Sequence, residues 1–143
     1  GTGAAMLLAT PLDSAAQQGE QPETHIMTIT TFYVPLGPER ENFFEYVDTY
    51  MVPQTKDDPH VVSFRFGAHN WGGNQPNIWL ITEYASLSAI DQSTEWGNAW
   101  FEEHYPEGSA ARDAADKDFD EMFAPYFSKH TDNIITVNMN RAK

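Results

Sequence analysis

Residues 77–91, with the sequence NIWLITEYASLSAID, join a β-strand pattern directly to the start of a helix. The first half alternates and is rich in β-branched and aromatic side chains, which is typical of a strand. One face of this strand would carry Ile78, Leu80, Thr82 and Tyr84, and the other Trp79, Ile81 and Glu83. Ser86 or Ser88 can then accept a hydrogen bond from a free amide at the start of a helix. The segment therefore predicts a strand that is followed at once by a helix.

Three further stretches have a strand pattern, and helical patterns lie between them. The strands are predicted at residues 25–34 (HIMTITTFYV), 61–69 (VVSFRFGAH) and 134–140 (IITVNMN), and residues 70–77 form a Gly/Asn/Pro hairpin loop. A helix is predicted from Pro38 to Pro53, followed by a loop at residues 56–59. Two more helices follow the third strand, one ending near Tyr105 and one capped by Ser109 and kinked or ended by Pro125. Asp132-Asn133 is predicted to turn the chain into the last strand.

The order β-α-β-β-α-(α)-β places the chain in the α+β class, with the ferredoxin-like split β-α-β arrangement. Its antiparallel sheet carries the helices on one face. The other face would carry Tyr33, Trp79, Ile81 and either Ile135 or Met139, a surface that is too apolar to leave in water. A second copy of the sheet is the simplest cover, so we expect a dimer that packs face to face through Tyr33, Trp79 and Ile81.

The element order and residues 77–91 resemble the dimeric α+β barrel superfamily, which includes antibiotic-biosynthesis-monooxygenase-like, EthD-like and NIPSNAP-like domains. The resemblance covers residues 25–140, and its motif is an aromatic-rich third strand followed by an S-L-x-A helix start. It implies two sheets that pair into a barrel, often around a pocket. Some members oxidise aromatic polyketides without metal or flavin, and some bind haem. Monooxygenase-type members use Asn, Trp, Tyr and Arg in the pocket, so Asn70, Trp71, Trp79 and Arg65 are candidates by type.

An enzyme of this kind would act on an aromatic or polyketide-like substrate in the barrel. Arg65, His69, Asn70 and Trp79 would then position the substrate or an oxyanion. Haem or another small ligand would need His69 or His25 to face an open cavity. The more ordinary interpretation is that His69 ends a strand bonded to backbone or water, and that the tryptophans fill a core or an interface.

The charge and the amino-acid composition exclude several classes of protein. The 143 residues carry a formal net charge of −13 and no cysteine. Disulfides, zinc–thiolate sites and thiol nucleophiles are therefore excluded, and binding to nucleic acid is electrostatically disfavoured. No apolar run approaches the ~18 residues that a membrane span needs. Twelve acidic and three basic residues lie between Glu83 and Asp132. They form either an ordinary solvated face or an adaptation to a saline or extracellular setting.

No metal or cofactor is expected from the spacing of the possible ligands. The five histidines form no HxH, HxxxH or HExxH spacing. The run Asp116-x-Asp118-x-Asp120-Glu121 superficially resembles a calcium loop. It lacks the glycine and the distal glutamate of such a loop, and it falls in a helical pattern where alternate side chains diverge.

Residues 1–24 differ from the rest of the chain, which we assign to one domain at residues 25–143. They contain no Lys, Arg or aromatic residue, and residues 4–9 (AAMLLA) form their one apolar stretch. Two interpretations remain open: the tail of a secretion signal without its basic start, or an extended arm of the mature protein. An apolar stretch of this length suits strand addition to a sheet edge, with Met6, Leu7 and Leu8 as subunit contacts. We expect the arm to be held by its own domain or by a neighbouring subunit.

These observations favour a self-assembling, non-catalytic structural protein whose arm joins subunits, for example in an extracellular filament. A head-to-tail contact of this kind gives rings or open filaments. The alternative is a cofactor-independent monooxygenase or cyclase-type enzyme. The expected partner is the protein itself, as a dimer or a polymer. A small aromatic ligand is a further possible partner. The absence of cysteine, the acidic charge and the Ala-rich start favour an extracellular or periplasmic location over a cytoplasmic one.

Overall fold

The computed structural model describes residues 23–69 and 77–141, with only the backbone of Arg141. Four strands and five α-helices make up this part of the chain. The strands are β1 (Thr24–Tyr33), β2 (Val61–Ala68), β3 (Asn77–Tyr84) and β4 (Thr131–Asn138). The helices are α1 (Pro38–Tyr46), α2 (Val52–Asp57), α3 (Leu87–His104), α4 (Ala110–Asp118) and α5 (Ala124–Phe127). Two π-helical turns (Val47–Met51 and Phe119–Phe123) and a 3-10 turn (Met139–Arg141) complete the order.

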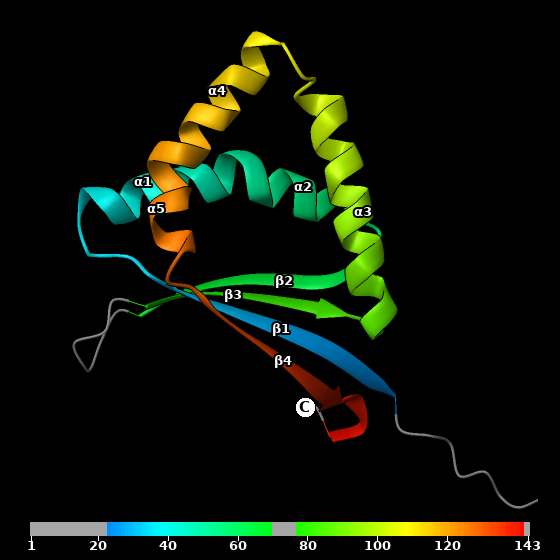
Figure 1. The fold of residues 1–143 in the computed structure, drawn as a ribbon. Helices are drawn as coiled ribbons and strands as arrows, with labels where there is room; N and C mark the ends of the chain where they lie inside the picture. Colours follow the sequence, from blue (N-terminus) through cyan, green and yellow to red (C-terminus); the bar gives the residue numbers. More distant parts are fainter. Residues whose placement is uncertain (1–22, 70–76, 142–143) are drawn as a thin grey trace, which may run out of the picture.

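The four strands form one antiparallel sheet in the order β2-β3-β1-β4, and the helices lie together on one side of it (Figure 1). This is the ferredoxin-like arrangement, so the predicted fold class is confirmed. β1 and β3 are the central strands, and β2 and β4 are the two edges. Residues 1–22 of the predicted arm (1–24) and residues 70–76 of the predicted hairpin loop (70–77) lie outside the described residues, whereas Thr24 and Asn77 are the first residues of β1 and β3.

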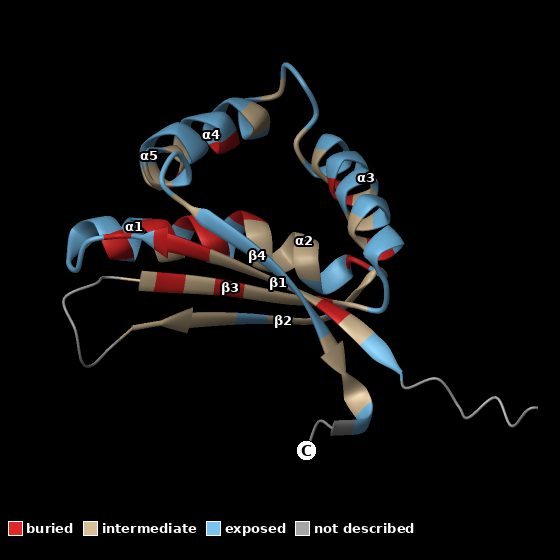
Figure 2. Ribbon diagram, turned by 60° about the horizontal axis from the view of Figure 1, so that its bottom comes forward, coloured by how far each residue is buried: buried red, intermediate tan, exposed pale blue. Residues whose placement is uncertain are grey.

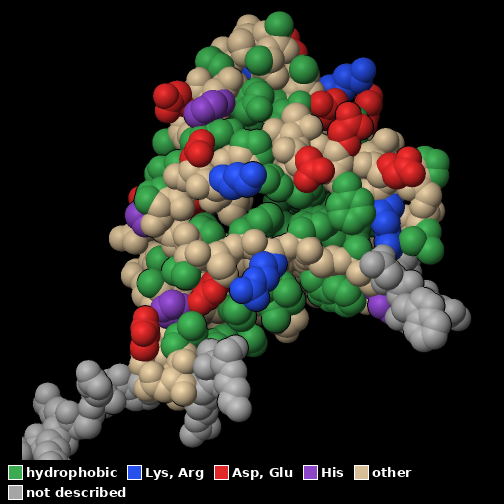
Figure 3. Space-filling view, turned by 180° about the vertical axis from the view of Figure 1, so that it is seen from behind, with side chains coloured by type: hydrophobic (Ala, Val, Ile, Leu, Met, Phe, Trp, Pro, Cys, Tyr) green, Lys and Arg blue, Asp and Glu red, His purple; other side chains and the backbone are tan. Residues whose placement is uncertain are grey.

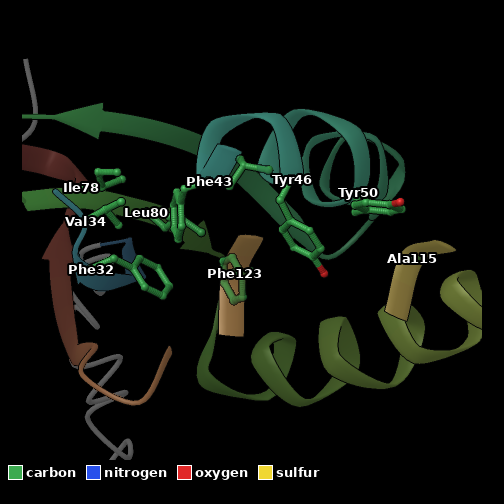
Figure 4. Close-up of a cluster of buried hydrophobic side chains, with 10 residues drawn as sticks. Phe32, Val34, Phe43, Tyr46, Tyr50, Ile78, Leu80, Ala115 and Phe123 are labelled. Carbon is green, nitrogen blue, oxygen red and sulfur yellow. The ribbon is translucent and has the colours of Figure 1, made fainter. Parts of the chain in front are cut away.

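The core lies between the central strands and the helices, where the buried residues of β1, β3 and α1 meet (Figure 2). Aromatic rings dominate it. Phe32 and Phe43 are 2% and 0% exposed, and the ring of Phe123 lies 5.3 Å and 5.2 Å from theirs (Figure 4). Edge-to-face and offset ring contacts of this kind add stability beyond simple burial. Within the described ranges, no helix combines the length and the apolar character that crossing a membrane requires.

The prediction that Pro53 ends the first helix is wrong. The chain continues through α2 to Asp57, because the π-helical turn Val47–Met51 stands immediately before Val52 and Pro53. Proline has no amide hydrogen and its ring clashes with the carbonyl four residues earlier. A wider π-helical turn at this point accommodates that clash without ending the helix. The predicted loop therefore begins later, at Asp58.

The last strand also differs from its prediction. It spans Thr131–Asn138, so Asp132 and Asn133 belong to β4 and do not form the turn that precedes it. The strand pairs with β1 from its first residue, and Thr30 Oγ1 donates a hydrogen bond of 2.7 Å to Asp132 Oδ1. This cross-strand bond and the main-chain pairing outweigh the usual preference of Asp and Asn for turns. Met139 and Asn140 leave the strand in a 3-10 turn.

Candidate functional site

The face of the sheet opposite the helices is largely apolar, and all the labelled helices lie on its other side (Figure 1). Strand alternation and the pairing register place seven large apolar side chains on it. They are Met27, Ile29 and Tyr33 of β1, Trp79 and Ile81 of β3, and Ile135 and Val137 of β4. Tyr33 is 38% exposed and Ile135 is 41% exposed. We call this surface the open face.

A polar cluster lies within the open face. Glu83, which is 8% exposed, accepts hydrogen bonds from His25 Nδ1 at 2.5 Å and from Ser63 Oγ at 2.7 Å. His25 Nε2 also lies 3.1 Å from Glu23 Oε1. Three strands supply the cluster, since His25 is on β1, Glu83 on β3 and Ser63 on β2. These partners satisfy both oxygens of a nearly buried carboxylate, as a charge at this depth requires.

The hydrogen bonds of the cluster also set its protonation. The bond from His25, and then that from Ser63, lower the pKa of Glu83, and the charge of Arg65 acts in the same direction. The bond to Glu83 raises the pKa of His25, against the opposing effect of burial. Each partner thus favours the charged form of the other. The cluster therefore favours a charged His25–Glu83 pair on the open face.

The structure describes some of the candidate residues that the sequence indicated, and others lie outside the described residues. Arg65 pairs with Ile81 across β2 and β3, and Trp79 lies beyond Ile81 on the same face. The ring of His69 lies 6.2 Å from that of Trp79, and Trp79 pairs with Gly67 of β2. Asn70 and Trp71 lie outside the described residues. Arg65 and Trp79 are therefore on the open face, where they would meet whatever covers the sheet.

A cavity of about 330 Å³ lies on the other side of the sheet, beneath the helices. Aromatic and aliphatic side chains form most of its wall, and three polar residues of β1, β4 and the α5–β4 link lie together within it. The residues that line it are Thr30, Phe32, Tyr46, Met51, Leu80, Phe123, Phe127, His130 and Asp132. A mostly apolar cavity with a few convergent polar groups is typical of a small-molecule site.

His130 and Asp132 form a hydrogen-bonded dyad in this cavity. His130 Nε2 lies 2.9 Å from Asp132 Oδ2, and its Nδ1 is bonded to the carbonyl oxygen of Phe127. The bond to the Phe127 carbonyl, followed by the charge of Asp132, raises the pKa of His130. The imidazole also stacks on the Phe127 ring at 4.3 Å. A histidine held in this way can exchange a proton with a bound molecule near neutral pH.

Sequence reasoning gave His130 no role. The available signal was the spacing of His130 and Asp132 at the start of a strand, since residues two apart in a strand share a face. That signal was hidden because Asp132 was assigned to a turn. The strand begins at Thr131, directly after His130, and the hydrogen bond shows that the side chains of His130 and Asp132 reach each other.

Comparisons with known proteins identify the fold. No protein-family model matches the chain, and no curated protein matches it. A dimeric ferredoxin-like protein from an uncultured marine organism superposes with a TM-score of 0.52 at 17% identity, covering 80% of this chain and 89% of that one.

Two further solved structures are similar at lower TM-scores. A dimeric ferredoxin-like protein of unknown function from Thermobifida fusca gives 0.48 at 12% identity, covering 80% of this chain and 92% of that one. An EthD family protein from Bacillus halodurans superposes with a TM-score of 0.47 at 12% identity, covering 77% of this chain and 96% of that one. At these identities the likeness concerns the fold. The chain thus has a ferredoxin-like fold, as the strand order of its own sheet and the superposition at a TM-score of 0.52 both show.

Proposed function

We propose that this protein is a self-associating structural protein whose unit is a dimer paired through the open face. The observation that supports the proposal is the row of large apolar side chains on a sheet face that no helix of the described chain covers. Burial of each such side chain contributes roughly 1.5–3 kcal/mol. A patch of this kind marks an interface in an otherwise strongly charged protein.

The polar cluster is compatible with burial in such an interface. A partner sheet laid over Glu83 would leave no unpaired charge there, because His25 and Ser63 already satisfy the carboxylate within one subunit. An unpaired charge would oppose association, whereas a paired and hydrogen-bonded one costs much less. The two copies need not supply complementary charges to each other at this point.

In this proposal the arm at residues 1–24 joins dimers into larger assemblies. Met6, Leu7 and Leu8 are its apolar contacts, and the arm carries no Lys or Arg. An arm donated from one dimer to the next gives a ring or a filament, depending on the rotation between the units.

The test of the dimer is a substitution in the middle of the open face, Ile81→Asp, with the molar mass measured by light scattering. The wild-type protein is expected to be a dimer or larger, and the variant is expected to lose the face-to-face contact. Leu87→Asp is the matched control, because Leu87 is 62% exposed and lies at the start of α3, away from the open face. The proposal is wrong if the wild-type protein is a monomer, or if both variants behave alike.

The test of the arm is removal of residues 1–24. The truncated protein is expected to remain a dimer and to form nothing larger, because all seven large apolar side chains of the open face are retained. Electron microscopy of the full-length and truncated proteins at equal concentration compares the assemblies directly. Identical small particles in both samples would contradict the role of the arm.

A second candidate function rests on the cavity at His130. We propose, as the alternative, a cofactor-independent monooxygenase or cyclase-type enzyme that acts on an aromatic or polyketide-like substrate. The rings of Phe32, Phe123 and Phe127 would hold a flat molecule, and His130 would move a proton. Arg65 and Trp79, by contrast, lie on the opposite face of the sheet from this cavity.

The enzyme is tested by incubating the protein with a panel of aromatic and polyketide-like compounds and analysing the products by mass spectrometry. His130→Asn is expected to abolish conversion while the thermal unfolding midpoint shows that the fold remains. If wild-type protein neither converts nor is stabilised by any compound of the panel, the enzyme is excluded for that class of substrate. Conversion that survives in the variant would exclude His130.

A further inference from the structure

A second hollow lies at the edge of the sheet, between α2 and β2. Its volume is about 430 Å³, and Figure 3, which views the molecule from behind, shows hydrophobic side chains gathered around a hollow in this region. The residues that line it are Val52, Thr55, Lys56, Asp58, Val61, Val62, Ser63, Phe64 and Phe66. The groove therefore runs along most of an edge strand, and its wall combines the apolar side chains of β2 and Val52 with polar or charged residues, chiefly of α2 and the turn that follows it.

The backbone of β2 is available along this groove. His69 N donates to Asn77 O at 2.9 Å, which fixes the phase of the hydrogen-bond alternation between β2 and β3. Because antiparallel partners alternate between bonded and non-bonded pairs, the amide and carbonyl groups of Phe64 and Phe66 face outward from the edge. Val62, at the bulge of this strand, is 51% exposed. Exposed apolar edge strands readily accept another strand.

The chain itself contains a segment that fits this edge. Residues 4–9 (AAMLLA) are uncharged and apolar, and the surrounding arm has no other apolar run. Six extended residues span about 20 Å, comparable with the length of β2. Side chains on one side of such a strand would enter the groove, and the outward backbone groups of Phe64 and Phe66 would bond to it.

The arm also leaves the domain near the groove. Ile26, close to the start of β1, pairs with Tyr84, and Tyr84 also pairs with Val61 at the start of β2. The described chain thus begins at the end of the sheet where the groove begins. Residues 10–22, when extended, reach up to about 40 Å, several times the spacing of about 4.8 Å between strands. The arm is therefore long enough to cross the two strand spacings that separate β1 from a β2 edge.

From these observations we infer that the groove between α2 and β2 receives residues 4–9 of a neighbouring copy as an added strand. The inference rests on the proposed self-association through the arm, and it names the surface that accepts the arm. The other edge, at β4, is the competing acceptor, since Ile134 on that strand is 61% exposed.

The absence of cysteine makes a cross-linking test direct. Single variants of the full chain carry Val62→Cys in the groove, Ile134→Cys on the opposite edge, and Leu7→Cys or Leu8→Cys in the arm. Each arm variant is mixed with each edge variant under mild oxidation, and disulfide-linked pairs are counted on a denaturing gel. Successive side chains of a strand point to opposite sides, so one of the two arm positions should cross-link to Val62→Cys several-fold more than the other.

The outcomes separate this inference from the proposed function, because the molar mass of each mixture is measured before oxidation. Preferential cross-linking at Val62→Cys supports the inference. Cross-linking that is equal at Ile134→Cys, or equal for both arm positions, overturns docking as a strand in this groove. Large assemblies without a cross-link at Val62→Cys overturn the docking site while self-association stands. A monomer with no cross-links removes both. A double variant that carries Val62→Cys and an arm cysteine in one chain tests docking within a copy. If it forms a disulfide within the chain while the mixed single variants form none, donation to a neighbour is overturned.

Discussion

At the scale of single residues, Glu83 is a charged group held in a surface that is otherwise apolar. Its hydrogen bond to His25 spans two strands, at 2.5 Å, with side chains that are 10% and 13% exposed. Low exposure limits screening by water and salt, so the pair interacts more strongly than a surface ion pair would. Its contribution to folding depends on pH through both partners.

The two partners lose their contributions at opposite ends of the pH range. The pKa of His25 is raised above 6.5, so its contribution is complete below that value and is lost as the pH rises through the folded-state pKa. The pKa of Glu83 is lowered below 4.5, so its contribution is present above that value and is lost as the pH falls through the folded-state pKa. The His25–Glu83 pair therefore stabilises the fold most between these limits, at weakly acidic pH.

We predict that His25→Gln destabilises the fold more at about pH 5.5 than at about pH 9. The free energy of unfolding is measured by urea titration at one fixed protein concentration, since association also contributes to it. Glu83→Gln should likewise destabilise the fold more at about pH 5.5 than at about pH 9. The double variant should lose little more free energy of unfolding than either single variant. If the difference in free energy of unfolding between the wild type and each variant does not change with pH, the ion pair is contradicted.

The sequence predicted which residues share the open face, but it could not predict this pair. Alternation along one strand places Trp79, Ile81 and Glu83 together without knowledge of their neighbours. Contact between His25 and Glu83 depends on the register between β1 and β3, in which Met27 is opposite Glu83. A shift of that register by one residue would place His25 elsewhere, and no local pattern in the sequence fixes it.

At the scale of elements, the helix starts were predicted better than the helix ends. Ser86 and Ser109 cap α3 and α4 through bonds to the amides of Ala89 and Arg112. A cap is a local interaction within four residues, so the sequence contains all of it. Passage of a helix through Pro53 depends instead on how far the preceding turn can widen, which the packing of the neighbouring elements decides.

We predict that Ser109→Ala lowers the free energy of unfolding by about 1 kcal/mol. Ser109 Oγ accepts a hydrogen bond from Arg112 N at 3.1 Å, and removal of that acceptor leaves an amide of the first turn of α4 without its partner. Ser109→Asp is the control, because Asp retains the acceptor and adds a favourable charge at the helix N-terminus. Urea denaturation of the three proteins at one pH provides the measurement. Equal losses in Ala and Asp would show that the cap does not stabilise α4.

At the scale of the whole molecule, the distribution of charge should control self-association. Each copy carries a formal net charge of −13, so two copies repel one another at low ionic strength. The open face itself carries Arg65, His25 and Glu83 among the described residues, so its own charge is small. The attraction between two open faces is therefore mainly apolar, while the opposing repulsion is long-range and sensitive to salt.

We predict that sodium chloride strengthens the dimer, with the dissociation constant falling between about 10 mM and about 0.1 M salt as the screening length shortens from about 30 Å to about 10 Å. Sedimentation at several protein concentrations measures the constant at each salt concentration. Chloride is used because sulfate would strengthen apolar burial by itself. Ile81→Asp should remain monomeric over the same range, because screening cannot replace the lost contact. If added salt instead weakens the dimer, ion pairs between copies hold it together, and the apolar open face is not the interface.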